Sequence, residues 1–426
     1  MVTTGTAASR PRVGVDESLV WLIEQLWERP EQRPAVRAST DGTVPAGYRP
    51  VERYAVVPSL SRTRFLIPLA TRRAAWASTA RYNALRPTRI RLARSAIGVG
   101  MLLGLAQRAL RDRIVVCVRE TTALGDLSPL LPSVHLAEVL GERVVMGVGI
   151  GGQGPNRKPT LQLFAPDGTP VGYAKVGWNG LTRQLVRNEA GALRARGTRP
   201  LTTVTVPDLL AAGGWNGLEL TVAAPLPPGV RRHGSPERRP PLEATREIAA
   251  LGGLQTIPLA ESPYWVGTRE LAARAGGGPD ARLTSALERY QQFILRHWAD
   301  TALTFGSWHG DWVPWNLAWK DGRLFAWDWE HSGDGVPLGF DLLHWHFWVA
   351  FALERRAPVE AATRCLARGM PWLRDLGVSE SAARGTAALY LMEALLRCWR
   401  MQAEGAGWNP RFYPAILRAL EVHADA

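Results

Sequence analysis

A short hairpin in the C-terminal half of the chain constrains the fold more than any other feature. Asp321-Gly322 is a strong two-residue turn signal, flanked by Leu-Ala-Trp-Lys before it and Arg-Leu-Phe-Ala-Trp after it. A hairpin closed by this turn pairs Lys320 with Arg323 and, farther from the turn, brings Asn316 beside Asp328. An amide and a carboxylate that are distant in sequence are therefore predicted to meet at one end of the hairpin.

The residues that precede the hairpin supply further groups that phosphoryl transfer requires. The run His-Gly-Asp311-Trp-Val-Pro-Trp-Asn316 places the Asn five residues after the Asp. In the catalytic loop of kinases this spacing joins an Asp that accepts the hydroxyl proton to an Asn that holds magnesium. Magnesium prefers hard oxygen ligands and keeps its other positions for water and phosphate, and Asn316 with Asp328 would allow this.

The full run, with Trp-Asp-Trp-Glu and Pro-Leu-Gly-Phe-Asp after the loop, resembles the signature of the aminoglycoside phosphotransferase and choline kinase-like family. Members of this family are small-molecule relatives of protein kinases. The resemblance implies a protein-kinase-like bilobal fold of the α+β class, with a β-rich N-lobe at 133–225 and an α-helical C-lobe with the catalytic loop at 226–426. It does not cover 1–125, which is expected to form an additional N-terminal α/β region of unknown function.

The resemblance also implies roles for individual residues. Asp311 would be the catalytic base, and Asn316 and Asp328 the magnesium ligands, with Glu330 as a further candidate ligand. The remaining two residues of the signature would give structural support to the catalytic loop, Asp341 as its buried anchor together with His309.

A glycine-rich stretch follows the first strand expected in the N-lobe. Glycines 147, 149 and 152 spell Gly-x-Gly-x-x-Gly, but a dinucleotide-binding fingerprint must open a helix, and here two prolines and a strand follow. A loop between hairpin strands is the favoured interpretation. Its backbone amides could approach nucleotide phosphates closely, because glycine has no Cβ. The candidate residues are Gly149, Gly151, Gly152 and Gly154.

Lys175 and Glu189 complete the nucleotide site that the resemblance implies. Lys175 lies near the end of the third expected strand, where a kinase-like fold places the lysine that pairs with the nucleotide phosphates. Glu189 follows in a helical stretch, where the partner glutamate is expected. The alternative is that both are ordinary surface residues.

The catalytic loop departs from the family pattern, since Trp312 and Trp315 stand where small or polar residues are usual. Eight of the 18 tryptophans fall between Trp308 and Trp348. Aromatic walls suit sugar faces, apolar groups or cations, so Trp312 and Trp315 are candidates for the acceptor pocket. An aminoglycoside acceptor therefore does not follow from the resemblance.

Positive charge is concentrated in one segment. The chain carries a net charge of +13, and between Ser61 and Arg113 we count twelve Arg against the single acid Asp112. An anionic membrane surface would explain this patch, with nucleic acid a less favoured partner. The plain alternative is solvated, arginine-rich helix faces. The sequence leaves the oligomeric state open.

Three cysteines without metal-ligand spacing, and no apolar signal segment, predict a cytoplasmic protein, with peripheral membrane contact as one alternative. The sequence thus predicts an ATP- and Mg²⁺-dependent phosphotransferase that moves the γ-phosphoryl group to a hydroxyl of a small molecule. One alternative is a nucleotide-binding pseudokinase or scaffold. Another is a basic membrane- or nucleic-acid-associated protein whose kinase-like domain is accessory.

Overall fold

The computed structural model describes residues 14–81, 85, 88–105, 110–150, 157–232, 239–278, 280–406 and 412–424. The candidate phosphate-binding residues Gly151, Gly152 and Gly154 lie outside these ranges. The chain divides into two compact units. Unit 1 comprises Met1–Gly152, Lys158–Trp178 and Gly214–Gly217, and unit 2 comprises Gln153–Arg157, Asn179–Gly213 and Leu218–Ala426.

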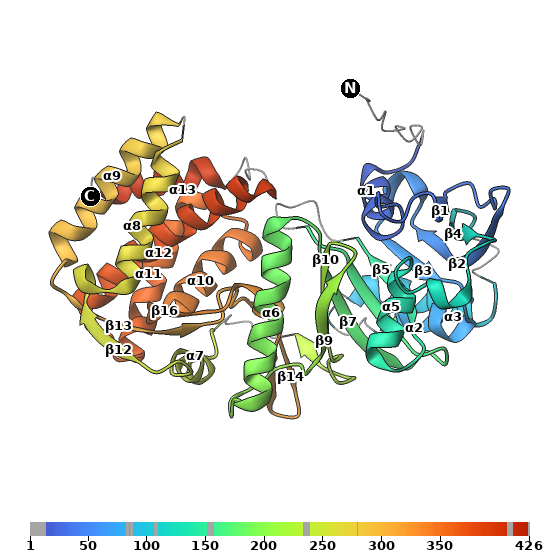
Figure 1. Cartoon of the computed structure of the whole chain (residues 1–426). Helices are drawn as coiled ribbons and strands as arrows, with labels where there is room; N and C mark the ends of the chain where they lie inside the picture. The colour runs from blue at the N-terminus through green and yellow to red at the C-terminus, as the bar shows by residue number, and fades with distance from the viewer. Residues whose placement is uncertain are drawn as a thin grey trace, which may run out of the picture. The chain divides into compact units, whose positions relative to one another are not determined.

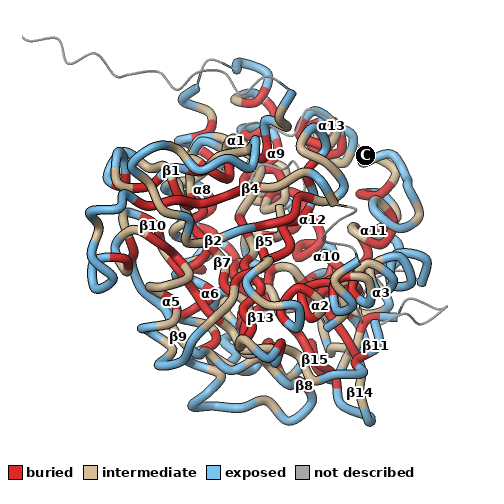
Figure 2. The backbone as a smooth tube through the Cα atoms, turned by 90° about the vertical axis from the view of Figure 1, so that its right-hand side faces the viewer, coloured by how far each residue is buried: buried red, intermediate tan, exposed pale blue. Residues whose placement is uncertain are grey.

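Unit 1 is built on antiparallel strands in the order β1-β4-β2-β3-β5-β6-β7. Strand β4 is a run of buried β-branched and apolar residues, which Figure 2 shows as a buried stretch. The bounds are β1 Val36–Ser39, β2 Tyr48–Val57, β3 Phe65–Pro68, β4 Arg113–Arg119, β5 Val145–Gly149, β6 Thr160–Phe164 and β7 Pro170–Gly177.

The N-terminal region and the first strands of the expected N-lobe share this one sheet. Strand β3 pairs with β5 through Leu66 opposite Val148 and Phe65 opposite Gly149. The boundary expected between 125 and 133 therefore falls inside unit 1. In the described part of unit 1, the α-helices beside the sheet are α1 Glu17–Leu26, α2 Arg72–Ala80, α3 Thr88–Leu102 and α5 Pro132–Leu140.

Helix α2 is fixed at its start by Thr71, whose hydroxyl oxygen accepts a hydrogen bond from the Ala74 amide at 3.0 Å. Its buried face consists of small residues, which allows α3 to pack closely against it. Arg94 of α3 donates to the Ser78 carbonyl at 2.9 Å and so joins the two helices.

The first helix of unit 2 is α6 (Gly180–Thr198). At its N-terminus, Asn179 and Thr182 form a reciprocal capping box. The hairpin strands β9 (Leu209–Trp215) and β10 (Leu218–Ala223) follow. Two small sheets carry the loops of interest. One contains β12 Gln255–Pro258, β13 Ala302–Trp308 and β16 Gly333–Pro337, and the other contains β11 Arg231–Arg232, β14 Leu317–Lys320, β15 Arg323–Ala326 and β8 Val204–Thr205.

The rest of unit 2 is helical, and its helices gather around α12 (Figure 1). Their core is rich in aromatic residues, among them Trp265, Tyr290 and Phe340, which are all almost fully buried. The bounds are α7 Leu242–Ala249, α8 Pro263–Gly276, α9 Ala281–Trp298, α10 Phe340–Trp348, α11 Pro358–Asp375, α12 Glu380–Met401 and α13 Tyr413–Ala424.

The structure confirms the expected α+β class, with the strands of the N-lobe followed by a helical C-terminal part. Most elements expected from periodicity are present with small changes at their ends. Strand β1 lies in the stretch 30–47, whose proline and polar residues are typical of a loop, so its strand is not evident from the sequence. Among the described residues, no helix is long and apolar enough to cross a bilayer.

Candidate functional site

Asp341 fixes the segment that follows β13. Its carboxylate accepts the backbone amides of His309 at 2.7 Å and of Gly310 at 3.0 Å, from a buried position in the first turn of α10. Burial raises the pKa of Asp341 to about 7, although the two backbone amides and Arg397 act to lower it. The expectation that Asp341 is a buried residue next to this loop agrees with its position.

Gly310 has a conformation and surroundings that only glycine accepts. Its φ is +79°, and a Cβ added there would overlap the backbone carbonyl of His331. The loop therefore passes directly over the 328–331 segment. Arg397 of α12 holds it from the other side, where its Nη1 donates to the Gly310 carbonyl at 2.8 Å.

His309 is fully buried and makes one contact with each ring nitrogen. With Nε2 protonated, it donates to the Trp327 carbonyl at 3.1 Å, while Nδ1 accepts the Asp311 amide at 3.2 Å. One imidazole thus ties the segment after β15 to the backbone of Asp311. This geometry suits the structural role expected for His309.

The Asp311 carboxylate is contacted on both oxygens and keeps 31% of its side-chain surface exposed. Asn316 Nδ2 donates to Oδ2 at 2.8 Å and also to the Asp311 carbonyl at 3.1 Å. His344 Nε2 lies 3.2 Å from Oδ1, and the Tyr390 hydroxyl lies 3.2 Å from His344 Nδ1. With Nε2 protonated, Tyr390 donates to His344 and His344 donates to Asp311.

These contacts keep Asp311 ionised. Burial acts to raise its pKa, but the hydrogen bond and charge of His344, together with the charges of His331 and His309, hold the pKa well below its usual range. The pKa of His344 is itself lowered, chiefly by burial, although Asp311 acts to raise it. The pair therefore consists of a carboxylate and a neutral imidazole near neutral pH.

The hairpin expected from Asp321-Gly322 is confirmed. Strands β14 and β15 pair Lys320 with Arg323 and Leu317 with Ala326, and both turn residues have positive φ. At the open end, the Trp327 amide donates to the Asn316 carbonyl at 3.2 Å, so Asn316 lies beside the residue that precedes Asp328.

Asp328 has left-handed backbone dihedrals, φ 65° and ψ 52°, at the start of the short turn Trp329–His331. For a non-glycine residue this conformation costs about 1–3 kcal/mol, and such residues often cluster at functional sites. Glu330 in the same turn is buried, with its Oε1 3.7 Å from His331 Nε2. Arg196 of α6 lies over the Trp329 ring at 5.4 Å, which places α6 against this turn.

The donor set at the open end of the hairpin fits Mg²⁺. The amide nitrogen of Asn316 is used by Asp311, so its amide oxygen is the atom that can face a cation. The Asp328 carboxylate is a second hard oxygen ligand, and magnesium is commonly held by one or two carboxylates plus substrate phosphates. Within the described ranges there is no group of three or more His, Cys, Asp or Glu side chains that could hold a metal without such help.

The remaining nucleotide-site candidates lie on separate elements. Gly149 ends β5, and Lys175 lies on β7 opposite Thr160 of β6, both in unit 1. Glu189 lies on α6 in unit 2 and is buried. The two tryptophans of the loop differ, because Trp312 is fully buried in the core whereas Trp315 is partly exposed and lies edge-on to Trp348 at 6.4 Å.

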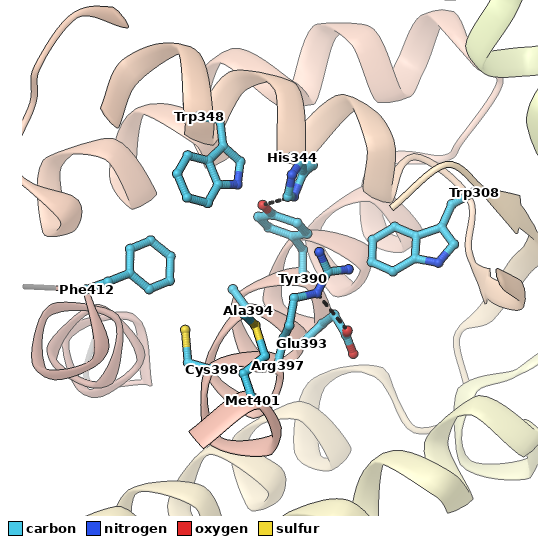
Figure 3. A pocket seen from close by; sticks show the side chains of 10 residues that line it. All are labelled: Trp308, His344, Trp348, Tyr390, Glu393, Ala394, Arg397, Cys398, Met401 and Phe412. Atoms are coloured by element: carbon cyan, nitrogen blue, oxygen red, sulfur yellow. Dashed lines mark hydrogen bonds and ion pairs between the residues drawn. The ribbon is translucent and has the colours of Figure 1, made fainter. Parts of the chain in front are cut away.

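A cavity of about 120 Å³ lies on the α12 side of the loop. His344 and Arg397, which contact Asp311 and Gly310, both line it (Figure 3). No functional role follows from the sequence for His344, Tyr390 or Arg397. The signal that could have found the last two is helical spacing, because Tyr390 and Arg397 are seven residues apart and lie on one face of α12.

No family model matches the sequence, and no curated protein matches it. Among solved structures, the chain is similar to a thermostable mutant of aminoglycoside phosphotransferase APH(4)-Ia in ternary complex with ADP and hygromycin B. The identity is 12% and the TM-score 0.43, over 69% of this chain and 98% of that one. An amicoumacin kinase in complex with AMP-PNP, Ca²⁺ and Ami is 12% identical, with a TM-score of 0.41 over 65% of this chain and 88% of that one. A glucosamine kinase is 14% identical, with a TM-score of 0.35 over 67% and 91%.

Proposed function

We propose that the protein transfers the γ-phosphoryl group of ATP to a hydroxyl group of a small molecule. The observation that carries this proposal is a solvent-accessible, ionised Asp311 whose carboxylate is held by Asn316, at the open end of the hairpin where Asn316 lies beside the residue that precedes Asp328. A base beside two hard oxygen ligands is the arrangement that phosphoryl transfer needs.

Asp311 would accept the proton of the acceptor hydroxyl. Each carboxylate oxygen accepts one hydrogen bond here, and an ionised carboxylate has about four lone-pair positions, so both oxygens retain capacity. Transfer forms a bond between the acceptor oxygen and the γ-phosphorus and breaks the bond from that phosphorus to the bridging oxygen, which leaves with ADP. The displaced hydroxyl proton passes to Asp311 and then to solvent.

Asn316 and Asp328 would hold Mg²⁺, with Glu330 as a further candidate ligand. When bound, the metal ion supplies positive charge against the phosphate oxygens. Gly149 and Lys175 of unit 1 and Glu189 of unit 2 stay candidates for nucleotide contacts, on the roles that the resemblance implies for them. His309 and Asp341 hold the loop through the contacts described above.

Two substitutions distinguish the proposed role of Asp311 as the base from that of Asp328 as a metal ligand. Asp311→Asn should leave Mg²⁺-dependent ATP binding in place but lower turnover about 10²–10⁴-fold, the usual contribution of a general base. Asp328→Ala should lose Mg²⁺-dependent ATP binding together with turnover. Isothermal titration measures binding, and ADP release in the presence of a panel of small alcohols and amino sugars measures transfer.

Asp321→Asn is the matched control, since it changes an exposed carboxylate at the far end of the same hairpin, in a conformation that Asn accepts. It should behave as the wild type in both assays. Near-wild-type turnover in Asp311→Asn would make the assignment of the base wrong. Absence of any Mg²⁺-dependent ATP binding at millimolar nucleotide would overturn the whole proposal.

A second function is favoured by one surface of unit 1. We infer that α3 docks on an anionic membrane surface. Opposite its buried face, which holds Gly98 and Met101, α3 presents Leu92 and Val99 to solvent, and Leu103 follows one residue beyond the helix. The three leave 67%, 51% and 61% of their surface exposed.

Charge complementarity indicates the occupant of this surface. Arg89 and Arg91 are exposed at the start of the same helix, within the segment of twelve Arg and one acid. An apolar face flanked by arginine suits the boundary between acyl chains and anionic headgroups. At 15 residues the helix would lie on such a surface rather than cross it.

A further inference from the structure

The cavity beside the catalytic loop has predominantly apolar walls. Trp348 and Phe412 form a stacked pair, with ring centroids 5.7 Å apart and planes within 11°. The other contributors are Trp308, Tyr390, Ala394, Cys398 and Met401, with His344, Glu393 and Arg397 as the polar groups (Figure 3).

Two of the three polar groups of the cavity, His344 and Arg397, make hydrogen bonds in the structure, although Arg397 Nε makes none. His344 uses one ring nitrogen on Asp311 and the other on the Tyr390 hydroxyl. Arg397 donates to the Gly310 carbonyl and lies over the Trp308 ring at 4.7 Å. Few polar atoms therefore remain for a ligand that needs many hydrogen bonds, such as an unmodified sugar.

The charges of the cavity also compensate one another. Arg397 Nε lies 3.7 Å from Glu393 Oε1, with both side chains mostly buried, so one positive and one negative charge meet at the same wall. A polyamine would be attracted by the Glu393 carboxylate but repelled by the Arg397 guanidinium. An anion would be attracted by Arg397 but repelled by Glu393. This wall favours an uncharged ligand, because each charge is already neutralised by its neighbour.

The size of the cavity limits what can enter. Its volume is about 120 Å³, and an apolar cavity of about 150 Å³ takes up a single benzene ring. A ligand portion of one six-membered ring is therefore near the upper limit. Aminoglycosides, which contain several rings, are too large for this space.

One wall of the cavity adjoins the proposed base, although Asp311 itself does not line the cavity. His344 forms part of this wall and contacts Asp311 Oδ1, so a hydroxyl that extends past His344 from a ring in the cavity would approach the base. We propose that this cavity binds the ring of an uncharged aromatic or alicyclic alcohol, and that the hydroxyl of this alcohol is the phosphoryl acceptor. The proposal rests on the phosphotransferase function above and adds the class of its acceptor.

Benzyl alcohol and cyclohexanol are suitable probes, with glucosamine as the charged comparison. Binding can be followed without ATP by ligand-observed NMR and by tryptophan fluorescence, because Trp308 and Trp348 line the cavity. We expect both alcohols to bind and glucosamine not to compete with them. With Mg²⁺ and ATP, benzyl phosphate and ADP should form in equal amounts.

Two substitutions test the location. Ala394→Leu adds three carbons to the wall and should weaken benzyl alcohol binding more than tenfold. Ala403→Leu makes the same change at an exposed position just beyond α12 and should leave binding unchanged. Met401→Ala enlarges the cavity and should allow the two-ring 2-naphthalenemethanol to bind.

The outcomes distinguish this inference from the proposed function. If neither alcohol binds, if Ala394→Leu and Ala403→Leu behave alike, or if glucosamine displaces benzyl alcohol, the acceptor class is wrong. The same holds if the alcohols bind but are not phosphorylated. Mg²⁺-dependent ATP binding that depends on Asp328 would still support the phosphotransferase in each of these cases.

Discussion

Asp311 illustrates how neighbouring side chains can set the state of one carboxylate. Its position and the role of Asn316 follow from their spacing in the sequence. Its contact with His344 does not, because that contact joins residues 33 positions apart and depends on how α10 packs against the loop. The apolar run around His344 predicts a packed or hydrogen-bonded histidine, which agrees with its burial but does not indicate its partner.

The pH dependence of transfer should reveal this contact. His344 lowers the pKa of Asp311 through a hydrogen bond and through charge, and Arg397 and Tyr390 are the other groups that face the imidazole. His344→Gln removes the imidazole, with its hydrogen bond and the charge that it carries once protonated at acidic pH, so the pKa of Asp311 should rise. The acidic limb of the profile of kcat/KM against pH should therefore move to higher pH.

His346→Gln is the control for this measurement, because His346 is a buried histidine of the same helix that lies beside Trp372 instead. If both substitutions shift the acidic limb equally, the effect comes from repacking of α10. If His344→Gln leaves the limb in place, His344 does not influence the base.

The hairpin is the element that the sequence specified best. Its turn type, register and open end all follow from two residues with positive φ between strand-forming stretches. The α12 wall of the cavity was harder to recognise. Its lining residues recur at helical spacing, but the same spacing is expected of any helix that packs against a core.

Substituting the turn should disturb the ligand pair at the other end of the hairpin. Gly322→Val places a β-branched residue at φ +76°, which costs about 1–3 kcal/mol. We expect a lower melting temperature and a higher Mg²⁺ concentration for half-maximal ADP release, because Asn316 and Asp328 are aligned by this hairpin. Asp321→Asn should change neither quantity, and a normal Mg²⁺ requirement in Gly322→Val would show that the hairpin does not align the ligands.

Helix α3 yields a prediction that is independent of catalysis. The doubly substituted Leu92→Ser/Val99→Ser protein should sediment less with vesicles that contain phosphatidylserine, because it removes apolar surface from the docking face. Arg89→Gln/Arg91→Gln should weaken binding more than tenfold, since each arginine near an anionic surface contributes about 1 kcal/mol. Added salt should weaken wild-type binding in the same way.

Leu124→Ser is the matched control, because Leu124 is 75% exposed but lies outside α3. Its binding should equal that of the wild type. Equal sedimentation with neutral and anionic vesicles, or none with either, would contradict membrane docking. The arginines would then be ordinary solvated surface residues.

At the scale of the whole molecule, the α+β class was expected because the catalytic-loop signature resembles that of a kinase-like family, whose fold has this class. The pairing between β3 and β5 was not predictable in the same way. It joins segments about 80 residues apart, and the local sequence of neither strand indicates which strand it pairs with.

Lysine is rare in this chain compared with arginine. Of the 51 basic residues, only Lys158, Lys175 and Lys320 are lysines. A compact ammonium group is therefore rare in this chain, and one of the three lies on β7, where the proposed nucleotide site requires it.

The pairing of β3 with β5 has a consequence for any shortened form of this protein. A chain that begins at Ser133 would keep β5, β6 and β7 but would leave the β3 side of β5 as a bare edge, with unpaired amide and carbonyl groups. Such an edge is a template for pairing with other chains, so this fragment should self-associate in size-exclusion chromatography, whereas the intact protein should not do so through this strand. In the intact protein, β3 of the N-terminal region would therefore reduce aggregation, because it pairs with this edge of β5.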